Sequence, residues 1–195
     1  MPFQKIHLHF QLIVNFFSDN VILVFYKSHY LEGNFMKKLS EKTNVMRILD
    51  KNKINYIIHN YLNTGAISGE DVAKVLNQDP KMVFKTLVTI GHSKNYYVFL
   101  VPVNSELDLK KAAKSVNEKN IEMIKSKDLL NITGYIHGGC SPIGMKKFFT
   151  TVIDKSAQER ENIIFSGGKI GYQVEMKIEE LEKIISFKLD DITKK

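Results

Sequence analysis

The sequence is poor in several residue types, and each scarcity excludes a class of protein. Its 195 residues include one cysteine, Cys140, so an internal disulfide framework is impossible. No apolar run approaches the roughly 18 residues that a membrane span needs, so no contact with a membrane is expected. Only two of the 28 basic residues are arginines, Arg47 and Arg160. Contacts to phosphate are therefore expected to be lysine point charges and not bidentate pairs.

The rest of the composition is that of an ordinary globular domain. Hydrophobic residues make up 44% of the chain and charged residues 25%, and the length suits one domain with a sizeable core. The formal net charge of +7 favours phosphate-bearing partners, although a basic surplus also keeps a protein soluble without such a partner. The single cysteine fits a reducing compartment, which agrees with a cytoplasmic location.

Residues 1–35 differ from the rest of the chain. They hold half of the twelve phenylalanines, and their charges cancel, so the whole positive surplus lies in residues 36–195. In AT-rich DNA, the codons for Glu32 and Gly33 would read as a ribosome-binding site just before Met36. We therefore predict an N-terminal extension of residues 1–35, translated from upstream sequence or poorly packed, and a domain of residues 36–195 that starts at Met36.

From Met36 onward, the pattern of apolar and capping residues predicts a mixture of helices and strands. Helices are expected after Ser40 at residues 41–51, after the capping pair Ser68 and Asp71 at 72–76, and at 108–116, 126–130 and 178–185. Strands are expected at residues 54–62, 83–90, 96–103, 121–124, 148–153, 163–166 and 170–176, with hairpin turns at 91–95 and 167–169. Because a regular alternation of strand and helix is absent, the predicted fold class is α+β in a single domain.

Lys85 is the most unusual residue in this pattern. In a strand of period two it shares a face with Val83 and Leu87. An ammonium group among apolar side chains lies either at a strand edge, where it reaches water, or in a cleft, where it acts on a ligand. The pattern alone leaves both interpretations open.

The glycine-rich loop at residues 138–142 is the second candidate site. Two adjacent glycines, Gly138 and Gly139, allow a backbone to approach a ligand closely and expose N–H groups, and Ser141 adds a hydroxyl; a tight structural turn is the alternative. A nucleophilic Cys140 would need a base such as His137 and a lowered pKa, so a buried apolar thiol is the interpretation we favour. No zinc-ligand spacing surrounds Cys140, and we expect no metal and no cofactor.

Several short motifs follow one another along residues 36–195. They are residues 49–54 (LDKNKI), 59–61 (HNY), 83–87 (VFKTL), 102–103 (PV), 107–114 (LDLKKAAK), 133–135 (TGY), 138–144 (GGCSPIG) and 166–169 (SGGK). In their order and spacing the chain resembles the YbaK/EbsC family of bacterial prolyl-tRNA editing proteins, and within it the Cys-tRNA(Pro) deacylase branch. Residues 1–35 lie outside the resemblance.

The resemblance implies a mixed α/β domain with a curved, partly barrel-like sheet flanked by helices. The family's key lysine matches Lys85, its loop glycine Gly138, its pocket tyrosine Tyr61 and its pocket serine Ser166. Gln173 stands where family members often carry aspartate, which keeps hydrogen bonding but loses a charge. The resemblance thus implies Lys85 and Gly138 as catalytic residues. The expected substrate contacts are Tyr61, Gly139, Ser141, Ser166 and Gln173, and the expected tRNA contacts are Lys110, Lys111 and Lys114.

The implied activity is hydrolysis of cysteine that was mischarged onto proline tRNA. No protein nucleophile is evident, so the attacking group is expected to be the substrate's own thiol, with release of a thiolactone. Lys85 and the loop N–H groups would stabilise the developing charge. The implied partners are the acceptor end of tRNA(Pro) and prolyl-tRNA synthetase. Two alternatives stay open, a deacylase of Ala-tRNA(Pro) and a non-catalytic module of the same fold that binds tRNA or a nucleotide.

Overall fold

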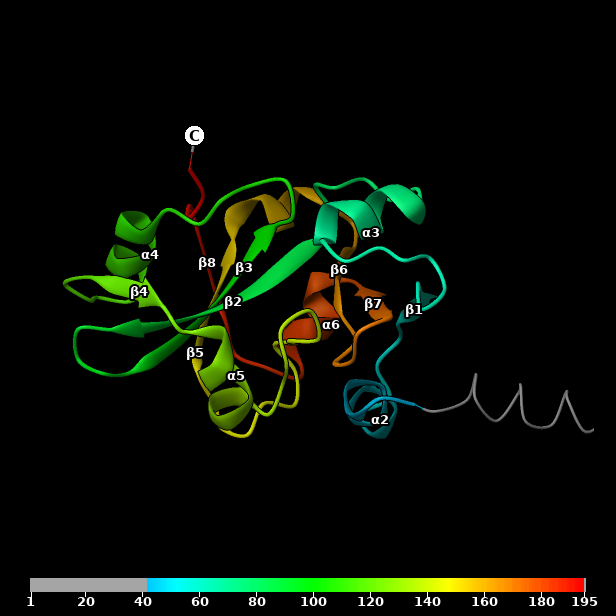
Figure 1. The fold of residues 1–195 in the computed structure, drawn as a ribbon, viewed down its shortest axis with the longest axis horizontal. Coiled ribbons are helices and arrows are strands. Elements are labelled where there is room, and N and C mark those ends of the chain that lie inside the picture. The colour runs from blue at the N-terminus through cyan, green and yellow to red at the C-terminus, as the bar shows by residue number, and fades with distance from the viewer. Residues whose placement is uncertain (1–41, 195) are drawn as a thin grey trace, which may run out of the picture. The chain divides into compact units, whose positions relative to one another are not determined.

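A computed structural model of the chain describes residues 42–194. The predictions for residues 1–35, for a start at Met36 and for a helix cap at Ser40 lie outside the described residues. The helices are α2 (Asn44–Lys51), α3 (Gly69–Val75), α4 (Leu109–Ser115), α5 (Ser126–Thr133) and α6 (Ile178–Glu182), with a 3-10 helix η1 (Lys155–Glu159). The strands are β1 (Ile57–Asn60), β2 (Phe84–Gly91), β3 (Tyr96–Pro102), β4 (Ile121–Met123), β5 (Thr150–Asp154), β6 (Ile163–Ser166), β7 (Tyr172–Met176) and β8 (Lys188–Asp190) (Figure 1).

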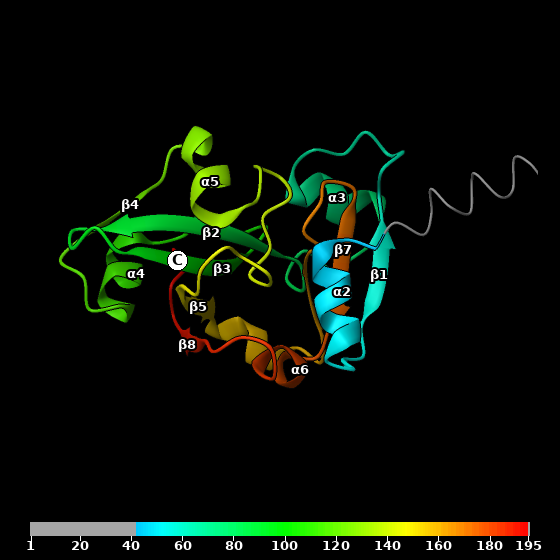
Figure 2. The ribbon, with the colours of Figure 1, turned by 90° about the horizontal axis from the view of Figure 1, so that it is seen from below.

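The strands form two sheets within a single α+β domain. One sheet has the order β1-β7-β6 and the other the order β4-β2-β3-β5-β8 (Figures 1 and 2). They meet at a parallel bridge between Val83 and Ile164, where the Ile164 N–H donates to the Met82 carbonyl over 2.8 Å. The α+β class is confirmed. In the described residues the strands form two sheets joined at this bridge, and no closed or curled barrel is present in place of the expected curved, partly barrel-like sheet.

Local signals placed most elements correctly. Ser68 and Asp71 form the predicted capping box at the start of α3, and Asp108 caps α4 by accepting from two backbone N–H groups. Strands β2 and β3 form the predicted antiparallel hairpin, as do β6 and β7. The sequence did not predict η1, β8 or the parallel pairing of β5 with β3 and β8. These pairings join segments that are far apart along the chain, so no local pattern marks them.

Strand β3 is buried on both faces and explains why residues 96–103 are continuously apolar. Val98 and Leu100 belong to the core cluster that contains Leu49 of α2, whereas Phe99 and Val101 pack with Ala112 of α4. A strand covered on both sides has no solvent face and shows no alternation of polar residues. The central sheet therefore supplies a rigid base for the groups that β2 carries.

The Glu118 carboxylate ties the tip of the β2–β3 hairpin to the segment after α4. It accepts hydrogen bonds from the Ser93 N–H at 3.2 Å, from the Ser93 hydroxyl and from the Tyr97 hydroxyl at 2.6 Å. The bonds from Ser93 and Tyr97 lower the pKa of Glu118 below its ordinary value. A lowered pKa in the folded state means that the carboxylate stabilises the fold above its unfolded pKa and stops doing so as pH falls through its folded pKa.

We expect Glu118→Gln to lower the thermal unfolding midpoint at pH 7, because the amide is a weaker acceptor for three donors. The difference from the unsubstituted protein should shrink as the pH falls through the lowered pKa of the folded Glu118, because the carboxyl itself then becomes protonated. Thermal unfolding at a series of pH values measures both effects. Glu122→Gln, at an exposed position on β4, is the matched control. A loss that is the same at pH 3 and pH 7 would contradict the role of the charge.

Candidate functional site

A cavity of about 690 Å³ lies where the two sheets meet. Its size is that of a small-molecule site. Strand β2 supplies one wall, the start of α3 and the segment from β4 to α5 supply others, and the β1-β7-β6 sheet faces them. Among the predicted site residues, the cavity brings together Tyr61, Lys85, Gly138, Ser166 and Gln173, which come from four separate parts of the chain.

The cavity exists because one edge of β2 lacks a partner strand over part of its length. In the described residues, β6 forms a bridge with Val83, the residue before β2, and β4 pairs with β2 only from Thr89 onward. The intervening residues 84–88 all line the cavity. The gap between the two neighbouring strands thus opens a space against the strand that carries Lys85.

Lys85 is half-buried in the cavity wall, and its Nζ donates to the Val103 carbonyl over 3.1 Å. Burial lowers the pKa of Lys85 below its ordinary value, while the charges of Glu70 and Glu106 act in the opposite direction. Glu70 also lines the cavity and lies in the first turn of α3. The ammonium group keeps further N–H donors for a ligand, because it has three and the carbonyl uses one.

The glycine loop contributes one backbone position to the cavity. Gly138 lines it with a φ of +79°, a conformation in which a side chain would be strained. Gly139 and Ser141 are not in the cavity wall. The Gly139 N–H donates to the Ile136 carbonyl over 3.0 Å, and the fully buried Ser141 accepts from the Ile143 N–H. Their predicted substrate contacts would therefore need the loop to move.

Cys140 lines the cavity but has the properties of an unreactive thiol. Its side chain is buried, and burial raises the pKa of Cys140 to about 12, with a smaller opposing effect from a hydrogen bond to Thr133. In the part of the chain that the structure describes, no hydrogen bond joins it to His137, which also lines the cavity. At neutral pH almost none of this thiol is a thiolate, so Cys140 is a poor nucleophile.

The wall that faces β2 comes from the smaller sheet. Gln173 of β7 lies opposite Ser166 of β6, and the Ser166 hydroxyl accepts from the Gly168 N–H over 3.2 Å. Tyr61 follows β1 and is held by its N–H bond to the Gly171 carbonyl over 2.8 Å. This wall therefore places a phenol ring, a hydroxyl and an amide opposite the Lys85 strand.

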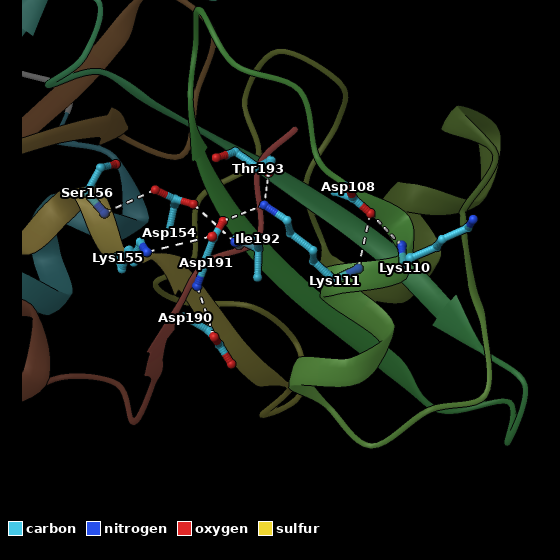
Figure 3. A network of polar contacts seen from close by, with 10 residues as sticks. All are labelled: Asp108, Lys110, Lys111, Asp154, Lys155, Ser156, Asp190, Asp191, Ile192 and Thr193. Atoms are coloured by element: carbon cyan, nitrogen blue, oxygen red, sulfur yellow. Dashed lines mark hydrogen bonds and ion pairs between the residues drawn. The ribbon is translucent and has the colours of Figure 1, made fainter. Parts of the chain in front are cut away.

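The three predicted tRNA lysines of α4 have different surroundings. Lys110 and Lys114 are exposed and line a groove of about 440 Å³ together with Lys119. Lys111 instead turns to the C-terminal segment, where its Nζ lies 2.8 Å from the Asp191 carboxylate and 2.8 Å from the Thr193 carbonyl (Figure 3). Lys111 is thus held by the C-terminal segment, whereas Lys110 and Lys114 are exposed.

Sequence reasoning missed several residues around Lys85. Glu70, Glu106 and Thr86 lie near its charge or in the cavity wall, and Gln78 reaches the cavity through Gln173. The capping signal at Ser68 predicted the helix that carries Glu70. No sequence signal, however, indicated that this helix packs against Val83 and Val103, the residues next to β2 and β3.

Residues 42–194 contain no group of three or more His, Cys, Asp or Glu side chains arranged to hold a metal ion. None of the helices in this same stretch has the length and apolar character needed to cross a bilayer.

Comparison with known proteins matches residues 65–184 to the aminoacyl-tRNA editing domain family. The chain is 42% identical over 160 residues to EbsC of Enterococcus faecalis, named as a Cys-tRNA(Pro)/Cys-tRNA(Cys) deacylase; the match covers 82% of this chain and 98% of EbsC. It is also 28% identical over 103 residues to the proline–tRNA ligase of Thermosipho melanesiensis, covering 53% of this chain and 18% of the ligase.

The fold is shared with a crystal structure described as a trans-editing enzyme for prolyl-tRNA synthetase. The TM-score is 0.67 at 18% identity, and the match covers 78% of this chain and 99% of the other. At this identity the likeness shows the fold alone. The family match at residues 65–184 includes the segment from α3 to β7, which supplies most of the cavity lining, and the comparisons agree with the resemblance to the YbaK/EbsC family.

Proposed function

Because the chain belongs to the aminoacyl-tRNA editing domain family, we propose that it is a deacylase that hydrolyses Cys-tRNA(Pro) in trans. The observation that carries this proposal is the half-buried Lys85, which directs an ammonium group into a cavity of small-molecule size. The match to 98% of the length of EbsC supports the same activity in this chain.

In this proposal Lys85 is the main catalytic group. An aminoacyl ester is already reactive, so a modest electrostatic contribution accelerates its cleavage. Lys85 stabilises negative charge on the reacting carbonyl oxygen or the terminal adenosine, and its field acts strongly because the cavity partly excludes water. Gly138 lines the same cavity, and its N–H is the proposed second donor, since the Gly139 N–H is used within the loop.

The nucleophile in this proposal comes from the substrate. The cysteinyl thiol loses its proton and attacks its own ester carbonyl, a carbon–sulfur bond forms, and the bond to the ribose oxygen breaks. That oxygen takes up a proton, and cysteine leaves as a thiolactone. The cavity then acts by positioning: Tyr61, Ser166 and Gln173 hold the aminoacyl group while Lys85 stabilises the oxyanion.

The groove beside α4 is proposed to bind the tRNA backbone. It contacts Ile121, which pairs with Gly91 at the far end of β2 from Lys85. At about 3.3 Å per residue, this places the groove about 20 Å from the reacting centre along the strand. A tRNA whose 3′ end occupies the cavity therefore has backbone phosphates within reach of Lys110 and Lys114.

We expect the double variant Lys110→Ala and Lys114→Ala to flatten the salt dependence of tRNA binding. Each lost phosphate contact should reduce the slope of log affinity against log salt by roughly 0.7 to 0.9. Hydrolysis at saturating tRNA should change little, because neither residue lies in the cavity. Binding titrations at several salt concentrations measure the slope. The control removes the same charge at two exposed lysines of other helices, Lys51→Ala with Lys74→Ala. An equal change in both double variants would show that only net charge matters.

The proposed function is tested by measuring deacylation of tRNA(Pro) charged with cysteine, alanine or proline, side by side. We expect Cys-tRNA(Pro) to be hydrolysed fastest and Pro-tRNA(Pro) to be spared. Preference for alanine would assign the sister activity, and binding without hydrolysis of any of the three would make the protein a non-catalytic tRNA-binding module.

Prolyl-tRNA synthetase is the proposed protein partner, since it releases the mischarged tRNA on which this activity depends. The cytoplasm is the proposed location, because tRNA charging occurs there in bacteria. Co-purification of the synthetase with the protein in the presence of tRNA(Pro) would test the partnership.

A further inference from the structure

Gln78 lies outside the cavity lining but forms a hydrogen bond to Gln173, which is part of the lining. Its Nε2 donates to the Gln173 Oε1 over 3.2 Å. Gln173 is 6% exposed and lines the cavity, whereas Gln78 is not part of the lining. No motif in the sequence marked Gln78. Through this contact, however, Gln78 orients the side chain of Gln173, which lines the cavity.

The end of α3 fixes the position of Gln78. Asn77 has a φ of +52°, the Gln78 N–H donates to the Ala73 carbonyl over 2.8 Å, and the Asn77 N–H donates to the Lys74 carbonyl. This is the arrangement by which a left-handed residue ends a helix. Because the backbone of Gln78 is held in this way, its side chain starts from a rigid point close to β7.

The hydrogen bond decides which end of the Gln173 amide is free. Its oxygen is occupied by Gln78, and in the described residues its Nε2 has no hydrogen-bond partner. The Gln78 Oε1 is buried without a partner. If both amides were reversed, the unpartnered buried group would be an NH₂ with two donors, which proteins tolerate less well than an unpartnered carbonyl oxygen. The arrangement in the structure is therefore the favoured one.

We propose that Gln78 is a specificity-determining positioning residue that turns the Gln173 NH₂ toward the cavity. This wall of the site then donates to an oxygen or a thiolate of the bound aminoacyl ester and offers no acceptor to its α-ammonium group. The inference rests on the proposed function, because it concerns how that same cavity recognises an aminoacyl ester.

Gln78→Glu tests the inference because a carboxylate only accepts hydrogen bonds. The Gln173 NH₂ would donate to it, and the Gln173 oxygen would turn to the cavity and accept from the ammonium group. The two probes are Cys-tRNA(Pro) and N-acetyl-Cys-tRNA(Pro), which lacks the ammonium group. We expect the ratio of their single-turnover rate constants to rise about tenfold in Gln78→Glu relative to the unsubstituted protein.

The double variant Gln78→Glu with Gln173→Leu separates orientation from charge, because it keeps the new charge and removes the amide. In this double variant, the ratio of the rate constants for the two esters should equal the ratio in Gln173→Leu alone. A ratio that stays unchanged in folded Gln78→Glu, or that rises equally in the double variant, would overturn the inference. Both outcomes leave the proposed function intact. An unsubstituted protein that hydrolyses neither ester would instead overturn the proposed function, and the inference with it.

Discussion

Replacing Lys85 by alanine is expected to lower single-turnover deacylation of Cys-tRNA(Pro) by about 100-fold or more. That is the scale of losing one preorganised group that stabilises a developing oxyanion. The Lys85 ammonium is partly removed from water, so its field on the substrate is weakly screened. Rapid mixing of charged tRNA with excess protein gives the rate constant directly, without a contribution from product release.

Two further variants test whether the loss of activity is caused by the missing charge of Lys85. Lys85→Met keeps an unbranched apolar stem and removes only the charge, so it should lose as much activity as the alanine variant while folding normally. Lys74→Ala removes an exposed lysine of α3 and should leave the rate unchanged. A Lys85→Met protein that retains full activity would refute the electrostatic role.

The pH dependence of the same reaction follows from two titrating groups. The rate should rise with pH as the substrate thiol, with an ordinary pKa near 8.5, forms the thiolate. It should fall again as Lys85 loses its proton, at a lower pH than an ordinary lysine would, because burial lowers the pKa of Lys85. In Lys85→Arg the falling limb should move out of the accessible range, since arginine stays charged.

Changing the substrate from cysteine to serine on the same tRNA is expected to slow the reaction by about 100-fold. A hydroxyl is almost never ionised at neutral pH and is a poor intramolecular nucleophile, whereas a few per cent of a thiol is thiolate. Cys140→Ala should leave the rate within about twofold, because a thiol whose pKa is raised to about 12 contributes almost no thiolate.

The opposite pair of results would reassign the nucleophile. If Cys140→Ala were folded and inactive while serine and cysteine esters reacted equally fast, the attack would have to come from the protein. Trapping cysteine thiolactone as the released product, by its reaction with an added amine, distinguishes the two mechanisms independently of any variant.

The fold could be predicted from sequence wherever the determining contacts are local. Ser68 and the turn after Gly91 each act within a few residues, and each gave the correct element. The sequence could not show that the strands form two sheets. The sheets meet at a bridge between Val83 and Ile164, and these two residues lie about eighty positions apart along the chain. The alternation of polar and apolar side chains along a strand indicates which face is buried, but it does not indicate which other strand lies beside it.

The site shows the same division. Lys85 stood out because a charged residue in an apolar strand is unusual, and Gly138 because two glycines are adjacent. Gly139 and Ser141 were grouped with Gly138 on sequence proximity, yet the turn at Gly138 directs their polar groups into the loop's own hydrogen bonds. Gln78 could not be found, since its effect depends on the packing of the end of α3 against β7.

The parallel pairing of β3 with β5 also bears on how the protein behaves when it is made in quantity. The β2–β3 hairpin closes across a short turn, whereas Thr150 must find Tyr97 across about fifty intervening residues, a slow step for a growing or refolding chain. Until then, β3 presents an apolar strand with an unpaired backbone edge, which is a template for another chain. Overproduction should therefore drive the protein into inclusion bodies through this strand, and slower synthesis or co-expressed chaperones should raise its yield.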